Sequence, residues 1–427
     1  MTAKFLFSVS GKIKFEPSFK ILSRDYIDFE QVDKATLNNL IFHIGMVELI
    51  SYWKATCSPE IIIRPHFLNE EQIRWWKKLY FNGLGEFFYL NGIEADAENF
   101  LTIEPGNETL SLCKSVLEEN KVIVPVGGGK DSAVTLELLA GKGFQLFPFA
   151  INPREATVRT IEAVGYSINE SLIIERKIDP KLLELNEQGF LNGHTPFSAL
   201  VAFTSVFSAI LSKTKFIALS NESSANQSTV PGSVINHQYS KSYEFETDFT
   251  WYIKKYVHTN VQYFSFLRPL TELQIAKLFI RFPWHFESFR SCNVGSKTDS
   301  WCGKCPKCLF TYIMLSPYIS RPTLERIFGK RLLNEENLKP ILDELTGVTE
   351  VKPFECVGTP EEVNVALRMT FERLYAKNEV PILLRNGNAN SFKDVSEKDI
   401  AAFLNSFNQE HLLPPRFLEI LTEILHD

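Results

Sequence analysis

The stretch Val122–Leu139 constrains the fold of this chain more than any other. It begins with Val122-Ile-Val-Pro-Val126, continues with Gly127-Gly-Gly-Lys-Asp-Ser132, and then carries apolar residues at helical spacing. The apolar β-branched run predicts a buried strand, the glycines predict a loop, and the spacing after Ser132 predicts a helix. A glycine loop at a helix start combines close backbone approach with unpaired amides and a positive dipole end. The stretch therefore predicts a phosphate-binding turn, rather than one in which glycines serve packing alone.

Strand and helix patterns alternate after this turn. Strands are expected at 144–151, 171–178 and 215–220, and helices at 155–164 and 196–211. Such an order predicts a parallel sheet with right-handed crossovers and ligands at the carboxyl ends of the strands. Asn152 follows the strand at 144–151 and falls at that edge.

The length of 427 residues predicts more than one domain. We expect an N-terminal α+β domain over 1–115, a nucleotide-binding catalytic domain over 116–320 and a helical C-terminal region over 321–427. The 45 basic and 51 acidic residues give a mildly acidic protein, which argues against nucleic acid as a partner. No secretory h-region and no run of eighteen apolar residues is present, so we expect a soluble, cytoplasmic protein without a membrane partner.

Four cysteines form a cluster typical of a metal site. Cys292 precedes Cys302-Gly-Lys-Cys305-Pro-Lys-Cys308, which contains two overlapping Cys-x-x-Cys steps. Four thiolates at this spacing predict a closed tetrahedral site for a structural Zn²⁺, with free or redox-active thiols as the alternative. Cys57 and Cys113 lie apart from the cluster and are expected to be buried apolar side chains.

A polar loop near the middle of the chain carries candidate catalytic groups. His237 is followed by Gln238, Ser240 and Lys241. A loop with several polar side chains favours a catalytic role for His237, with a purely structural role as the alternative. Arg268 precedes Thr271 and Gln274, which have the spacing of a helix capping box.

Taken together, these motifs resemble known families. GGGKDS is similar to the pyrophosphate loop (PP-loop) of ATP pyrophosphatases, except that Gly127 stands where that family generally has serine. Over residues 122–358 the chain also contains, in order, NGHTP, SNESSAN, NHQYSKS, FSFLRPLTELQIA, SCN, WCGKCPKC and PFECVG. This set resembles the MurL family of UDP-N-acetylmuramoyl-L-alanyl-L-glutamate epimerases. The resemblance implies an α/β fold of the PP-loop type with a small four-cysteine zinc knuckle.

The resemblance also implies an activity. MurL enzymes invert the terminal L-glutamate of UDP-MurNAc-L-Ala-L-Glu to D-glutamate, using ATP and Mg²⁺ and releasing AMP and diphosphate, for peptidoglycan precursor synthesis. A Cα–H bond beside a carboxylate resists deprotonation, and adenylation of that carboxylate allows the resulting enolate to be stabilised. We expect an ATP-dependent isomerase.

Site residues follow as hypotheses from the same resemblance. Gly127, Gly128, Gly129, Lys130 and Ser132 are expected to hold the phosphates, Asp131 to orient Mg²⁺ or the loop backbone, and Asn152 to lie near the adenosine. The candidates for carboxylate binding and proton transfer are Glu222, His237, Lys241 and Arg268, with His237 preferred because histidine titrates near neutrality. Cys356 is a further candidate base, with a plain core thiol as the alternative.

Two other functions remain open at this point. The cysteine pattern is also similar to that of 7-cyano-7-deazaguanine synthases, which suggests an enzyme that activates a nucleobase or tRNA carboxylate. A zinc-clamped nucleotide sensor without catalysis is the other alternative. The sequence leaves the oligomeric state undetermined.

Overall fold

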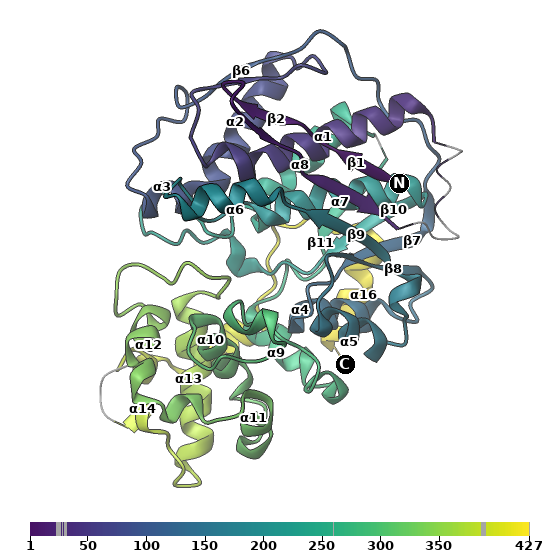
Figure 1. Cartoon of the computed structure of the whole chain (residues 1–427). Coiled ribbons are helices and arrows are strands. Elements are labelled where there is room, and N and C mark those ends of the chain that lie inside the picture. The colour runs from purple at the N-terminus through teal and green to yellow at the C-terminus, as the bar shows by residue number, and fades with distance from the viewer. Residues whose placement is uncertain (23–26, 28, 30–31, 259, 386–389, 427) are drawn as a thin grey trace.

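The structure of the protein is a computed structural model. It describes residues 1–427 except 23–26, 28, 30–31, 259, 386–389 and 427. Figure 1 shows a sheet-containing part and a lobe of helices beside it.

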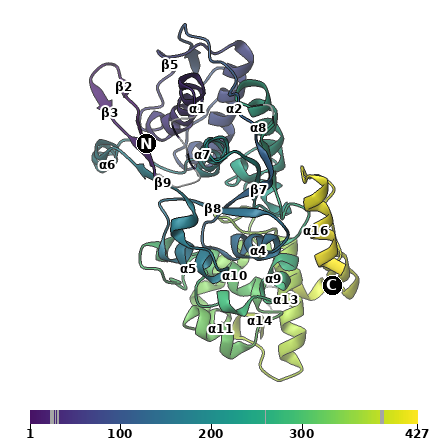
Figure 2. The ribbon, with the colours of Figure 1, turned by 90° about the vertical axis from the view of Figure 1, so that its right-hand side faces the viewer.

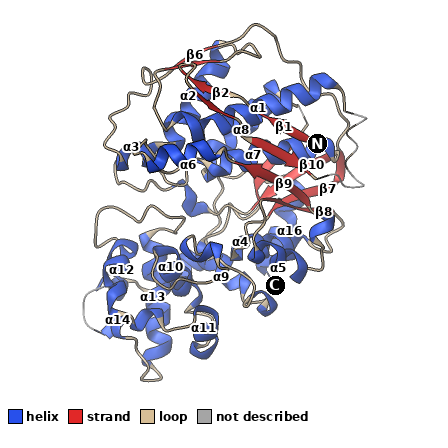
Figure 3. Cartoon of the chain, in the orientation of Figure 1, coloured by secondary structure: helices blue, strands red, loops and turns tan. Residues whose placement is uncertain are grey.

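A central seven-stranded sheet organises the described residues, in the order β1-β4-β9-β8-β7-β10-β11. The five strands from β9 to β11 in this order run parallel, whereas β4 is antiparallel to β9 and β1 is antiparallel to β4. Figure 3 shows the strands as one continuous layer. The strands are β1 (Thr2–Lys4), β4 (Ser18–Ile21), β7 (Glu118–Pro125), β8 (Gln145–Ile151), β9 (Leu172–Lys177), β10 (Thr214–Leu219) and β11 (Gln262–Ser265).

The predicted alternation of strands and helices is confirmed. Each expected strand is present within a few residues of its predicted bounds, and two of the helices between them are α5 (Glu155–Ala163) and α7 (Phe197–Leu211). A short helix, α6 (Pro180–Glu187), precedes α7. The sheet is parallel around the glycine turn, as the pattern requires.

Helices cover both faces of the sheet. Val122 and Val124 of β7 pack in one apolar core, and Ile123 between them packs in another, because successive strand residues face opposite sides. On the first face lie α4 (Lys130–Leu139), α5, α9 (Glu272–Phe279) and α16 (Pro415–His426), and on the second α1 (Lys34–Trp53), α2 (Glu70–Gly83), α7 and α8 (Tyr243–Tyr256). Figure 2 shows these layers from the side.

The N-terminal residues extend the central sheet. β1 and β4 add two strands to the edge formed by β9. A separate hairpin of β2 (Phe7–Val9) and β3 (Ile13–Phe15), a parallel pair of β5 (Glu60–Ile62) and β6 (Thr102–Glu104), and helix α3 (Gly85–Leu90) complete this region. Residues 1–115 thus share a sheet and a core with the residues that follow them.

The chain after the sheet is helical, as predicted. Helices α10 (Pro306–Leu315), α11 (Arg321–Phe328), α12 (Lys339–Thr346), α13 (Pro360–Tyr375), α14 (Ile382–Arg385) and α15 (Glu397–Leu404) follow one another. Helix α13 begins with a capping box formed by Thr359 and Glu362. The last helix, α16, returns to the sheet, where Phe417 stacks on Phe144 at 4.8 Å between ring centroids. No helix in the described part of the chain combines the length and apolar character of a membrane span.

Candidate active site

The glycine turn lies between β7 and α4 and leaves the start of the helix open. Gly129 is the N-cap of α4 and provides no side-chain cap. Gly128 has a φ of +87°, and a Cβ there would lie 2.8 Å from the backbone carbon of Ala156. The Arg290 amide donates to the Gly128 carbonyl at 2.8 Å. Uncapped amides and a backbone that only glycine allows here fit a phosphate group.

The two polar residues that follow the turn pair with each other. Lys130 is 3% exposed, and its ammonium contacts the carboxylates of Asp131 and Glu272. Burial lowers the pKa of Lys130, but the two carboxylates raise it more, so that its pKa lies above the ordinary value. The Lys130 side chain thus points to the start of α9, and its predicted contact with phosphate stays a prediction. Ser132 donates to the Gly129 carbonyl at 3.0 Å.

Buried carboxyl groups surround the Lys130 ammonium. Glu362 Oε1 accepts a hydrogen bond from the Glu272 amide at 3.0 Å. Burial raises the pKa of Glu272 to about 8 and that of Glu362 to about 7. These groups hold the starts of α4, α9 and α13 together beneath the glycine turn.

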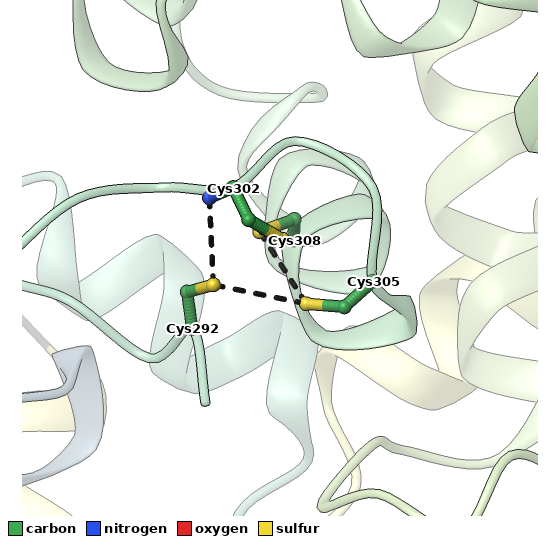
Figure 4. Close-up of side chains that lie close together, drawn as sticks. All are labelled: Cys292, Cys302, Cys305 and Cys308. Atoms are coloured by element: carbon green, nitrogen blue, oxygen red, sulfur yellow. Dashed lines mark hydrogen bonds between the residues drawn. The ribbon is translucent and has the colours of Figure 1, made fainter. Parts of the chain in front are cut away.

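The four clustered cysteines converge as a metal site would require (Figure 4). The Sγ–Sγ distances are 3.8 Å for Cys292–Cys305, 3.7 Å for Cys302–Cys308 and 3.5 Å for Cys305–Cys308. A Zn²⁺ with Zn–S bonds of about 2.3 Å sets tetrahedral edges of about 3.8 Å. The Gly295 amide donates to Cys292 Sγ at 3.1 Å, as a thiolate ligand requires. The residues thus fit a structural zinc ion.

The cysteine cluster fixes a loop that connects two parts of the site. Residues beside Cys292 contact both the glycine turn and segment 353–358. The Arg290 amide donates to the Gly128 carbonyl, and Asn293 Nδ2 donates to Glu355 Oε2 at 2.6 Å. On α10, between two of the cysteines, Lys307 contacts the carbonyl oxygen of Cys356. A clamp at this point holds residues 353–358 close to the glycine turn.

Three candidates from two distant segments meet in the structure: His237 and Lys241 both contact the Cys356 thiol. Lys241 Nζ donates to Cys356 Sγ at 3.1 Å, and the His237 ring also contacts this thiol. Burial raises the pKa of Cys356, but Lys241, His237 and Lys307 lower it more, to about 5. Cys356 is therefore a thiolate near neutral pH, paired with two cationic side chains.

Sequence reasoning missed two residues of this group, Glu86 on α3 and His194 before α7. Glu86 contacts His237 Nδ1, and its Oε2 lies 3.5 Å from His194 Nδ1. Burial lowers the pKa of His237, but Cys356 and Glu86 raise it more, to about 9. Burial, together with the positive charge on His237, Lys54 and Lys241, lowers the pKa of His194 to about 3. The NGHTP motif contains His194, but the sequence pattern assigned this histidine no role.

Glu86, His194 and His237 also satisfy the spacing of a metal site, since one ligand atom from each lies within 4.8 Å of the others. Direct contact between the Glu86 carboxylate and the His237 ring is the geometry of a hydrogen bond rather than of two ligands around an ion. Lys241 adds a positive charge beside the thiolate. The arrangement fits a carboxylate–imidazole–thiolate proton-transfer group better than a second metal centre.

The other candidates hold the surrounding loops. Arg268 is fully buried, and its guanidinium donates to Glu246 Oε2 at 2.9 Å, to the Glu222 carbonyl at 2.6 Å and to the Lys241 carbonyl. Glu222 Oε1 accepts from Ser224 Oγ at 3.2 Å. Arg268 thus contacts protein groups in the loops that carry Glu222 and Lys241.

Asn152 also binds backbone. It has a φ of +46°, and its side-chain amide pairs with the backbone N–H and C=O of Arg176, each at 2.9 Å. This contact fixes the carboxyl end of β8 beside the glycine turn. The predicted contact with adenosine stays a prediction.

Comparison with known proteins gives a consistent picture. Residues 1–266 match the family described as MurL N-terminal domain, and residues 288–398 match the MurL C-terminal domain. Proteins named UDP-N-acetyl-alpha-D-muramoyl-L-alanyl-L-glutamate epimerase are similar over most of their length. That of a Micromonospora species is 35% identical over 348 residues, covering 79% of this chain and 76% of that protein. That of Xanthomonas oryzae pv. oryzae is 31% identical over 384 residues, covering 88% and 84%.

Proposed function

The chain belongs to the MurL family, and from this premise we propose that it inverts the terminal L-glutamate of UDP-MurNAc-L-Ala-L-Glu in peptidoglycan precursor synthesis. The observation that carries the proposal is the match of both family domains, together with relatives at 31% and 35% identity that bear the epimerase name. The group around Cys356 supports it, because inversion requires side chains that take and return a proton.

We further propose that the reaction uses ATP, in a site of the PP-loop type. Transfer of AMP from ATP to the substrate carboxylate releases diphosphate, removes the negative charge and makes the neighbouring Cα–H bond more acidic. After inversion, water cleaves the acyl adenylate and frees D-glutamate and AMP. The uncapped start of α4 and the backbone of Gly127, Gly128 and Gly129 would hold the phosphates. Asp131, at 26% side-chain exposure, would face an Mg²⁺ ion or order the turn through Lys130.

Proton transfer is assigned to Cys356 and His237. The thiolate removes the Cα proton, and the His237 imidazolium is the acid that returns one. Both groups touch in this structure, so the substrate Cα must enter between Cys356 Sγ and the ring for the proton to return on the opposite face. Lys241 stabilises the thiolate, and Glu86 keeps His237 protonated.

Other candidates receive positioning roles. Arg268 fixes the loops of Glu222 and Lys241, because its guanidinium is enclosed and donates to both of their carbonyl oxygens. Glu222, buried beside these loops, remains a candidate for the hydrogen bonds that orient the substrate. The four-cysteine cluster would hold Zn²⁺ in a structural role, since four thiolates leave no ligand position for substrate.

One experiment tests the proposal. Purified protein is incubated in D₂O with ATP, Mg²⁺ and UDP-MurNAc-L-Ala-L-Glu, followed by chiral analysis of the glutamate, measurement of deuterium at Cα and quantitation of AMP. We expect D-glutamate, one deuterium at the inverted carbon and AMP in at least stoichiometric amount. Inversion that proceeds equally without ATP would refute the adenylation step, and AMP release without inversion would point instead to an enzyme that activates another carboxylate.

A further inference from the structure

A polar cavity of about 400 Å³ is lined by residues on both sides of His237 and has no role in the proposed reaction. The end of α2, the loop that leads into α8 and Glu410 form its walls. Its volume is within the range of about 300–1,000 Å³ that is typical of small-molecule sites. Amide and hydroxyl side chains provide most of the lining: Asn82, Asn226, Asn236, Ser228, Ser233 and Ser242.

The lining is suited to a neutral, hydroxyl-rich ligand. Asparagine amides both donate and accept hydrogen bonds, and serine hydroxyls do the same. Tyr239 and Tyr243 add aromatic surface, and Val234, which is 69% exposed, adds an apolar contact. An N-acetylated sugar presents this combination of hydroxyls, one amide and one methyl group.

The charges of the lining argue against a diphosphate. Among the described residues, those that line the cavity include no lysine or arginine, and its charged groups are Glu244 and Glu410. Diphosphate groups are usually bound by arginine, lysine or uncapped helix N-termini, and carboxylates repel them. The start of α8 also lines the cavity, but the Ser242 side chain caps it and Glu244 lies in its first turn. The nucleotide part of a UDP-sugar would therefore lie outside this cavity.

The position of the cavity matches the length of the substrate. Asn236 lines the cavity and directly precedes His237, and Tyr239 lies between His237 and Lys241 in the sequence. Asn82 lies four residues before Glu86. The cavity lining and the side chains of His237, Lys241 and Glu86 thus come from the same two segments. A lactyl group and two amino acids span about 10 Å when extended, so a sugar held here leaves its terminal glutamate within reach of Cys356.

We propose that this cavity binds the N-acetylmuramoyl sugar of the substrate and thereby makes the enzyme selective for a muramyl-linked dipeptide. The proposal rests on the proposed function, since it names the part of that substrate which the protein recognises. The uridine diphosphate then extends toward solvent and contributes little to affinity.

The test compares wild type with Ser228→Trp, which fills the cavity, and Asn82→Ala, which removes an amide from its wall. Asn99→Ala is the control, because Asn99 is exposed, does not line the cavity and donates from its side chain to the Asp96 carboxylate. For UDP-MurNAc-L-Ala-L-Glu, we expect Ser228→Trp to raise KM at least about tenfold, the equivalent of one or two lost hydrogen bonds, with kcat unchanged within twofold. Asn82→Ala should raise KM less, and Asn99→Ala should not change it. Thermal melts check that each variant is folded.

Inhibition and calorimetry separate the alternatives. N-acetylmuramic acid should compete with substrate for wild type and not for Ser228→Trp, whereas UDP should compete with neither. An unchanged KM in Ser228→Trp overturns the proposal. The proposal also fails if UDP competes with substrate for the wild type but not for Ser228→Trp, since the cavity would then bind the nucleotide. If wild type inverts no glutamate, the proposed function fails. Calorimetry with N-acetylmuramic acid on wild type and Ser228→Trp then still decides whether the cavity binds the sugar.

Discussion

Replacement of Glu86 by Gln is the most informative single change in this protein. Gln keeps the size of the side chain and its hydrogen bond to His237 Nδ1, but it removes the negative charge. Burial lowers the His237 pKa, and the contacts with Cys356 and Glu86 raise it, to about 9 compared with an ordinary value of 6.5. In the wild-type enzyme the ring is therefore an imidazolium, and able to return a proton, up to about pH 9.

The expected loss follows from this shift. An opposite charge in contact shifts a pKa by about 1–3, so we expect the His237 pKa to fall to about 7 in Glu86→Gln. The imidazolium fraction at about pH 8 then falls from about nine-tenths to about one-tenth. This lowers kcat about tenfold, which corresponds to a rise of about 1.4 kcal/mol in the apparent activation free energy. At about pH 6 the ring is protonated in both proteins, so the two should differ little there.

The measurement is kcat for inversion as a function of pH. We expect the alkaline limb to move down by about two pH units in Glu86→Gln, and Glu86→Asp to restore most of it. Glu71→Gln is the matched control, because Glu71 pairs with Lys255 and Tyr256 away from the site. An alkaline limb that stays in place in Glu86→Gln, or that moves equally in Glu71→Gln, would show that Glu86 does not set the protonation of His237.

Three further changes test other parts of the site. Cys356→Ser should abolish inversion and deuterium exchange at Cα while AMP formation continues; persistent exchange would exclude the thiolate as the base. If the four cysteines hold zinc as proposed, Cys308→Ser should lose the zinc that mass spectrometry detects in the wild type and cost at least about 2 kcal/mol of unfolding free energy, whereas Cys57→Ser should have the same zinc content as the wild type. Gly128→Ala should cost about 1–3 kcal/mol in thermal melts because of its +87° φ and the nearby Ala156 backbone, whereas Gly127→Ala, with open space around it, should keep the wild-type melting temperature.

Local patterns predicted much of the fold. The strands 144–151 and 215–220 and the helix after Ser132 have their expected bounds within a few residues, since apolar periodicity reports which face of an element is buried. The capping box of Thr271 and Gln274 was equally predictable, because these two residues bond within one helical turn. The addition of β1 and β4 to the central sheet could not be predicted from the sequence, because strand pairing across more than a hundred residues leaves no local signal.

The candidate site was predicted unevenly. His237, Lys241 and Cys356 were each chosen from a motif, yet no spacing indicated that they touch. Glu86 was missed because a single glutamate on a helix usually faces solvent. For Lys130 and Arg268 the motif gave the residue but not its partner. Their buried contacts with Glu272 and Glu246 depend on how α9 and α8 pack.

The sequence by itself determined the glycine turn, the cluster of four cysteines and the family, because each depends on residue types at short, fixed spacing. Only the tertiary structure decided the charge state of the site. A thiolate at Cys356 and an imidazolium at His237 arise because chain folding brings Lys241, Glu86 and these two groups into contact in a half-buried cluster. Electrostatic interactions become strong only at contact distance and in a medium of low dielectric, and both conditions are set by packing.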